Sequence, residues 1–144
     1  MNNYLKIVFS CVTHKYFQFK GRASRKEFCL LIVCYKLLNF IAAGSFYILK
    51  ENAYLSIIIN IYGFLLLFLI IPLIAVFVRR SHDLNFSGWW YLFFTTLISL
   101  GFSTVGKNVD KLFYVSIAFL IIFIFLIFLK GTPGPNKYGE PPVE

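Results

Sequence analysis

Residues 64–83 read FLLLFLIIPLIAVFVRRSHD, a long apolar run that ends abruptly at a charged cluster. Mostly apolar residues continue the run upstream to about residue 53. A helix over 53–78 is ~39 Å long at about 1.5 Å per residue, and ~30 Å suffices to cross the hydrocarbon core of a bilayer. The extra length allows a tilt or a kink, which Pro72 offers. The stretch therefore predicts a transmembrane helix that ends at a charged membrane surface.

The composition of the whole chain agrees with this prediction. Of its 144 residues, 59% are hydrophobic and 14% are charged, whereas a soluble domain is about 45–50% apolar and about 25% charged. Three further apolar stretches, over about 28–49, 89–105 and 112–129, are each long enough for a span of ~26–33 Å. We therefore predict a single all-α membrane domain, 1–144, with four transmembrane helices. The composition excludes a disordered chain, a disulfide-stapled secreted module and an ordinary water-soluble enzyme.

The two ends of the chain differ from the spans. Residues 3–20 place apolar side chains three or four positions apart, which predicts an amphipathic helix in the membrane interface; a plain basic arm is the alternative. Residues 131–144 are rich in glycine and proline and predict a turn-rich tail. Directly before the first span, residues 24–27 read SRKE, a capping box. In that motif Ser24 accepts from the Glu27 amide while the Glu27 carboxylate reaches back to the Ser24 amide.

Lysine and arginine residues gather on one side of this topology. Ten of the fourteen lie in the N-terminal arm (residues 1–27), in the loop after the second span and in the tail. Three lie on the other side of the membrane, and Lys36 lies within a span. Because cytoplasmic loops carry the excess of Lys and Arg, we expect both termini in the cytoplasm. Trp89 and Trp90 then stand at the cytoplasmic interface as anchors. The same rule accounts for the net charge of +8, so we expect no nucleic-acid binding.

The intramembrane polar candidates of the predicted spans are Lys36, Asn39 and Asn60. An intramembrane charge is costly, yet no acidic residue lies within any span, so Lys36 is expected to snorkel or to donate to backbone carbonyls. The same absence of carboxylates argues against a proton relay or a cation transporter. An oligomeric transporter or channel subunit stays an alternative, and it requires a polar path that also includes Thr95 and Thr96.

The expected topology brings three separated stretches to the cytoplasmic surface. We expect Glu27 or Asp83 to pair with the arginines, and the tail to fold back through Asn136 and Tyr138. The candidate residues of this surface are Arg22, Arg25, Glu27, Arg79, Arg80, His82, Asp83, Asn136 and Tyr138.

Three interpretations of these residues stay open. They form salt bridges that follow from topology alone, or they bind an anionic headgroup or another phosphate-bearing ligand, because Arg matches phosphate bidentately. The third is catalysis, with His82 as acid or base, oriented by Asp83. We expect no cofactor and no metal, because Cys11, His14, His82 and Asp83 fit no standard ligand spacing. The three cysteines form no C-x-x-C pair and are expected to stay free thiols.

Three motifs resemble one known family: FKGRASRKEF at 19–28, RRSHDLNFSGWW at 79–90 and GTPGPNKYGEPP at 131–142. The chain is similar over nearly its whole length to the bacterial inner-membrane family of "domain of unknown function 805", the YhaH-like proteins. Cys29 and Ser81 depart from the family pattern, which usually has Trp and Leu there. The resemblance implies a multi-pass protein of the bacterial plasma membrane and implies no activity.

The leading hypothesis is thus a non-enzymatic membrane protein whose cytoplasmic Arg/His/Asp face binds anionic lipid headgroups or a protein partner. A homo-oligomer is compatible with it. A membrane-embedded enzyme acting on a phosphate-bearing substrate through His82 and Asp83 is the other alternative.

Overall fold

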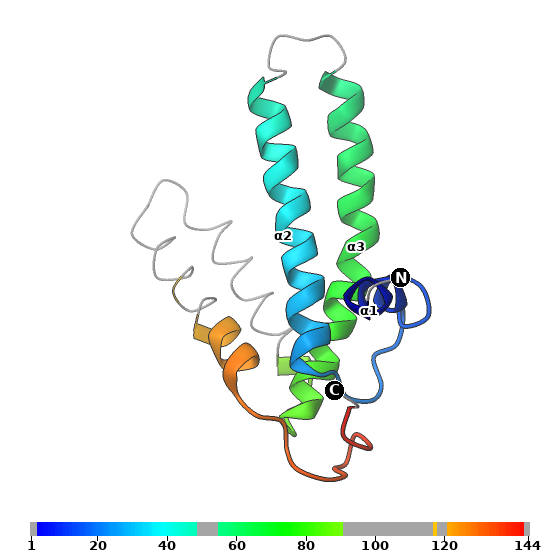
Figure 1. Cartoon of the computed structure of the whole chain (residues 1–144), viewed down its shortest axis with the longest axis vertical. Coiled ribbons are helices and arrows are strands. Elements are labelled where there is room, and N and C mark those ends of the chain that lie inside the picture. Colours follow the sequence, from blue (N-terminus) through cyan, green and yellow to red (C-terminus); the bar gives the residue numbers. More distant parts are fainter. Residues whose placement is uncertain (1–2, 49–54, 91–116, 118–120, 143–144) are drawn as a thin grey trace.

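The structure, a computed structural model, describes residues 3–48, 55–90, 117 and 121–142 (Figure 1). It is all-helical in this part of the chain, as predicted. The labelled elements are α1 (Asn3–Val12), α2 (Arg25–Ile48) and α3 (Leu55–Asp83), and residues 121–128 form a further helix. A single isolated bridge joins Asn136 and Gly139 in the described tail.

Two of the predicted spans correspond to α2 and α3, apart from residues 49 and 53–54, which lie outside the described residues. These two helices run side by side in opposite directions, and α1 packs across their lower part (Figure 1). The third predicted span, 89–105, is described only at its first two residues, which are helical. The fourth, 112–129, is described at 117 and from 121 onward. The arrangement of four spans therefore lies partly outside the described residues.

The apolar core is concentrated at one end of the helix pair. Phe28, Leu31 and Val76 are buried there, and the rings of Phe28 and Phe77 meet edge to face with centroids 4.8 Å apart. Farther along the helices, Phe40 and Phe64 are 77% and 74% exposed. Helices that are apolar on all sides yet little buried suit a hydrocarbon surrounding rather than water.

α3 has the length and composition of a membrane span. Its segment Asn60–Asp83 covers 24 residues, and the most apolar part of it has a mean hydropathy of 2.9. Within the described ranges it is the one helix that is both long enough and apolar enough to cross a membrane. The core helix of a soluble protein can have the same length and composition. Only 28% of that apolar part is buried within the chain, whereas a core helix is mostly buried.

The N-terminal helix is shorter than predicted. α1 ends at Val12 and turns follow over 13–17, so the expectation of a helix over 3–20 was wrong at its C-terminal end. The Thr13 hydroxyl donates to the carbonyl of Phe9 (2.7 Å), and the Lys15 amide donates to the carbonyl of Ser10 (2.8 Å). The second bond joins residues five apart rather than four, so it departs from the α-helical pattern and marks the end of the helix.

The apolar side of α1 is also divided between two surroundings. Cys11 is buried and Val8 packs against the core, whereas Leu5 and Phe9 are 61% and 55% exposed. Helical spacing alone places these residues on one broad face. The docking of α1 on α2 and α3 separates them into a buried edge and an exposed edge.

After α1, Tyr16 contacts the middle of α3. Pro72 has no N–H, so it cannot donate to the carbonyl of Phe68 four residues earlier in the helix. The Tyr16 hydroxyl donates to that carbonyl at 2.6 Å, and its ring packs on Phe68 with centroids 4.8 Å apart. A residue from the N-terminal arm thus supplies the donor that the proline lacks.

Candidate functional site

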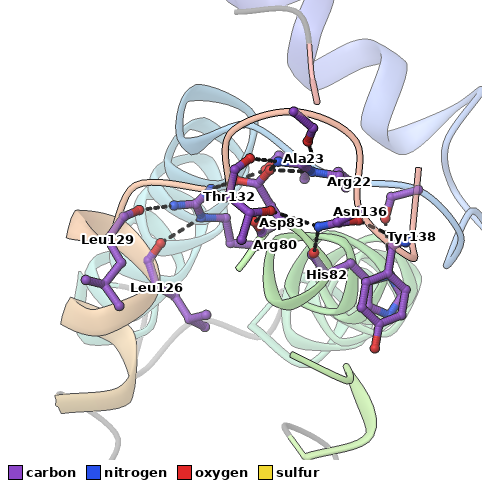
Figure 2. Close-up of polar contacts among 12 residues, drawn as sticks. Arg22, Ala23, Arg80, His82, Asp83, Leu126, Leu129, Thr132, Asn136 and Tyr138 are labelled. Carbon is purple, nitrogen blue, oxygen red and sulfur yellow. Dashed lines mark hydrogen bonds and ion pairs between the residues drawn. The ribbon is translucent and has the colours of Figure 1, made fainter. Parts of the chain in front are cut away.

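The candidate site lies where the N-terminal arm, the end of α3 and the tail meet, and Asp83 is its centre (Figure 2). Nε of Arg22 donates to Oδ1 of Asp83 at 2.8 Å, and Nη1 of Arg80 donates to Oδ2. All three residues are buried. We call Arg22, Arg79 and Arg80, with Glu27 and Asp83, the arginine cluster. Because a buried carboxylate needs cationic partners, Asp83 fixes the arm and α3 relative to each other.

Arg80 also binds the end of the helix over 121–128. Its Nε donates to the carbonyl of Leu126 at 2.8 Å, and its Nη2 donates to the carbonyl of Leu129 at 2.5 Å (Figure 2). The last carbonyls of a helix lack intrahelical donors, and the negative end of the helix dipole attracts a cation. Arg80 therefore caps this helix as well as pairing with Asp83.

Arg22 holds the tail in the same way. Its Nη1 donates to the carbonyl of Gly134 and its Nη2 to that of Thr132, both at 2.6 Å. The Thr132 amide in turn donates to the backbone carbonyl of Asp83 at 2.9 Å. These bonds give the glycine- and proline-rich tail a fixed path that its sequence does not impose.

His82 contacts the tail through stacking. Its ring lies parallel to that of Tyr138, with centroids 3.8 Å apart and planes at 6°. Nδ1 of His82 lies 3.1 Å from the carbonyl oxygen of Gly21, an acceptor, so Nδ1 carries the proton. Asn136 donates from Nδ2 to the carbonyl of His82 at 3.0 Å and accepts from the Tyr138 amide at 2.9 Å. The fold-back through Asn136 and Tyr138 is confirmed.

His82 and Asp83 are not arranged as a catalytic pair. Acid–base catalysis needs the carboxylate to orient the imidazole. The carboxylate of Asp83 instead accepts from Arg22 and Arg80, and the proton of the imidazole is directed to Gly21. The two side chains therefore do not form an oriented pair.

Glu27 is the second acidic centre of the cluster. Its Oε1 accepts from Nη1 of Arg79 at 2.5 Å, and its Oε2 accepts from Nζ of Lys15 at 3.2 Å. The Ser24 hydroxyl accepts from the Glu27 amide at 3.2 Å, so this half of the predicted capping box is confirmed. The other half was wrong: the Glu27 carboxylate accepts from Arg79 and Lys15 and not from the Ser24 amide. A buried carboxylate is stabilised more by two cations than by one amide.

Cys11 and Lys15 join this centre although the sequence did not indicate them. The Cys11 thiol donates to Oε1 of Glu27 at 3.4 Å. Burial, helped by the neighbouring Glu27 charge, raises the pKa of the Cys11 thiol to about 12. No local signal points to either residue, because only the docking of α1 on α2 brings them to Glu27.

Arg25 differs from the other arginines of the predicted surface. It is half-buried, and within the described ranges its side chain forms no hydrogen bond or ion pair. Arg79, by contrast, is fully buried, and its Nε and Nη2 find no hydrogen-bond partner among the described residues. The expected pairing of Glu27 and Asp83 with arginines is thus confirmed for Arg22, Arg79 and Arg80.

The other predicted site residues do not join the cluster. Asn39 donates to the carbonyl of Tyr35 on its own helix at 2.8 Å, while Lys36 and Asn60 are exposed. Within the described ranges no hydrogen bond joins these three side chains to one another. Trp89 and Trp90 are exposed and form the first two residues of the predicted span 89–105. Their role as interface anchors stays a prediction. Thr95 and Thr96 lie outside the described residues. No three His, Cys, Asp or Glu side chains converge in the described part of the chain.

Comparison with known proteins places this geometry in a family. The profile of the family described as "Protein of unknown function (DUF805)" matches residues 16–140. The chain is 32% identical over 144 residues to "Inner membrane protein YhaH" of Escherichia coli (strain K12), covering 99% of this chain and 97% of that protein. It is 29% identical over 136 residues to "Inner membrane protein YhaI" of the same strain, covering 91% of each chain. No solved structure matches the chain. The chain therefore belongs to the DUF805 family of bacterial inner-membrane proteins.

Proposed function

We propose that this protein crosses the bacterial inner membrane four times with both termini in the cytoplasm, and that it binds anionic lipid headgroups there without catalysing a reaction. The names of the relatives support the membrane, and the low burial of α3 within the chain supports a lipid surrounding. The arm, the end of α3 and the tail meet at one end of the helix pair (Figure 1). Most Lys and Arg residues belong to these segments, which supports a cytoplasmic location for that end.

The arginine cluster itself is not the headgroup site in this proposal. Arg22 and Arg80 direct their donors to Asp83 and to backbone carbonyls, and all three arginines of the cluster are buried. Their role is to hold the arm, α3 and the tail together. Contacts with headgroups therefore fall to the lysines around α1.

One observation carries the proposal of lipid binding: an exposed apolar edge of α1 lies beside a lysine-lined cavity. Leu5 and Phe9 form the exposed edge. Between α1 and the start of α2 lies a cavity of about 230 Å³, whose lining includes Lys6, Lys15 and Lys26. An interfacial helix buries apolar side chains among acyl chains while its lysines attract anionic phosphates, each by about 1 kcal/mol.

The lipid proposal is tested by lipid retention. Purified protein in nanodiscs of phosphatidylcholine with a minor fraction of phosphatidylglycerol is released into the gas phase for native mass spectrometry. We expect bound phosphatidylglycerol on the parent, and a several-fold loss in the K6Q/K26Q double variant. K137Q is the matched control, because Lys137 lies on the tail over Tyr138. Equal retention by K6Q/K26Q and the parent would contradict the proposal.

The topology is tested by labelling intact cells. A single cysteine replaces Lys20 in the arm or Lys137 in the tail, in a background without other cysteines. A membrane-impermeant maleimide added outside should label neither position until the inner membrane is permeabilised. Labelling of either position from the periplasmic side would place that end outside and would refute the topology.

A further inference from the structure

A second cavity, of about 410 Å³, lies between the start of α2, the end of α3 and the tail. Its lining includes Arg22, Arg25, Arg80, Asp83, Lys130 and Thr132, so four cations face one carboxylate. The rings of Pro141 and Pro142 form an apolar part of the wall. This cavity is separate from the lysine-lined cavity beside α1, and only Ser24 lines both.

Two of the four cations are already bonded and two are not. Arg22 and Arg80 donate to Asp83 and to the carbonyls of the last helix and the tail. The side chains of Arg25 and Lys130, in contrast, form no ion pair or hydrogen bond within the described part of the chain. Their charges are therefore available to a ligand that enters the cavity.

The charge balance of the arginine cluster points to a negative ligand. Three buried arginines, Arg22, Arg79 and Arg80, face only two buried carboxylates, Glu27 and Asp83. An uncompensated charge in a poorly hydrated place is costly, and Arg25 and Lys130 add two more positive charges at the cavity wall. An anion in the cavity lowers this cost, because Arg25 and Lys130 both line its wall.

The start of α2 adds to the positive potential of the same cavity. Ser24 is the N-cap of this 24-residue helix, and both Ser24 and Arg25 line the cavity. The first amides of a helix lack intrahelical acceptors, and the dipole is positive at this end, so the potential there favours an anion. The cavity also lies within the range of about 300–1,000 Å³ that small-molecule sites occupy, so it has room for more than a bare phosphate.

We propose that this cavity binds a phosphate group, held between Arg25 and Lys130, with its attached organic part against Pro141 and Pro142. The phosphate belongs either to a soluble phosphomonoester or to a lipid headgroup. The ligand would bridge the start of α2 and the tail, and so would bind only the folded-back tail. The proposal uses different residues from the lipid contacts of α1 and does not depend on them.

The test uses the full chain in nanodiscs of phosphatidylcholine alone, with the melting temperature followed during titration with inorganic phosphate and with glycerol 3-phosphate. We expect a rise in melting temperature whose apparent Kd is at least tenfold weaker in R25Q/K130Q, because each cation contributes a charge-assisted bond. K20Q is the matched control, since Lys20 is exposed and does not line the cavity. K6Q/K26Q should respond like the parent, which separates this site from the lipid proposal.

A second arm distinguishes the source of the phosphate. Nanodiscs that contain phosphatidylglycerol receive no added phosphate, and the lipid bound to the parent and to R25Q/K130Q is counted by native mass spectrometry. A response to glycerol 3-phosphate that depends on Arg25 and Lys130 supports the proposal with a soluble ligand. Retention of phosphatidylglycerol that depends on the same two residues supports it with a headgroup.

Two results would overturn the proposal. One is that neither the response to phosphate nor the retention of phosphatidylglycerol depends on Arg25 and Lys130. The other is that K20Q weakens binding as much as R25Q/K130Q, because binding would then follow total charge rather than the cavity. The single variant K130E changes an exposed residue, so its unliganded melting temperature should equal that of the parent. With the fold intact, its loss of the response to phosphate reports loss of binding.

Discussion

Gly131 lies against the carboxylate of Asp83 so closely that no side chain fits between them. A Cβ built on Gly131 would be 2.1 Å from Oδ2 of Asp83, far inside van der Waals contact. The same carboxylate accepts from Arg22 of the arm and Arg80 of α3. The absence of a side chain at residue 131 therefore lets the tail cover the central ion pair of the arginine cluster.

The first prediction concerns this contact. Replacement of Gly131 by alanine should lower the free energy of unfolding by about 1–3 kcal/mol, because the methyl group displaces a buried carboxylate or the tail. G63A is the matched control, since a Cβ on Gly63 of α3 meets nothing within 4 Å. The measurement is unfolding in mixed detergent micelles. A G131A protein as stable as the parent would show that the contact is looser than described.

The second prediction concerns the charge of Asp83. D83N leaves Arg22 and Arg80 buried without a carboxylate, and breaking such a pair from one side costs about 3–5 kcal/mol. E140Q is the matched control, because Glu140 is exposed on the tail. Thermal unfolding in detergent should separate the two variants clearly. Similar melting temperatures for D83N and E140Q would contradict the central role of Asp83.

A third prediction concerns Tyr16 and Pro72. Y16F removes the donor to the carbonyl of Phe68 and should cost about 0.5–1.5 kcal/mol. In a P72A background the alanine amide can serve that carbonyl, so the same Y16F substitution should cost less. A double-mutant cycle on the free energy of unfolding measures the coupling. Equal costs in both backgrounds would mean that the hydroxyl does not replace the missing amide.

A fourth prediction concerns the reactivity of Cys11. Because burial and Glu27 raise its pKa to about 12, only about one thiol in ten thousand is ionised at about pH 8, and the thiolate is the nucleophile. In a C29S/C34S background, a maleimide should react with the folded protein far more slowly than with the protein unfolded in SDS. Similar rates in the two states would refute the burial of Cys11 where α1 packs on α2.

The sequence predicted the features of the site that depend on local order or on topology. The N-cap at Ser24 lies within four residues of its partner. Arg79 and Arg80 follow the apolar run directly, although they lie in the last turns of α3, which ends at Asp83, and not in the loop that the sequence predicted after residue 78. The lengths of the apolar runs predicted where α2 and α3 lie in the sequence. These features depend on a few neighbouring residues or on the thickness of a bilayer, and both can be evaluated without a tertiary structure.

Features that depend on docking were not predictable in the same way. Helical spacing continues to Phe19, yet α1 ends at Val12, because Tyr16 and Lys15 find tertiary partners on Phe68 and Glu27. The sequence grouped Arg25 with the paired arginines, and only the structure separates the bonded cations from the unbonded one. Which arginine meets which carboxylate is decided by side-chain packing rather than by spacing.

The central claim is that Asp83 and the arginines fix the tail onto the end of α3, and hydrogen exchange tests it most directly. The Thr132 amide donates to the backbone carbonyl of Asp83. Peptides that cover 131–139 should therefore exchange slowly in the parent and at least about tenfold faster in D83N, with E140Q unchanged. Fast exchange of these amides in the parent, at the rate of an unstructured peptide, would contradict the claim.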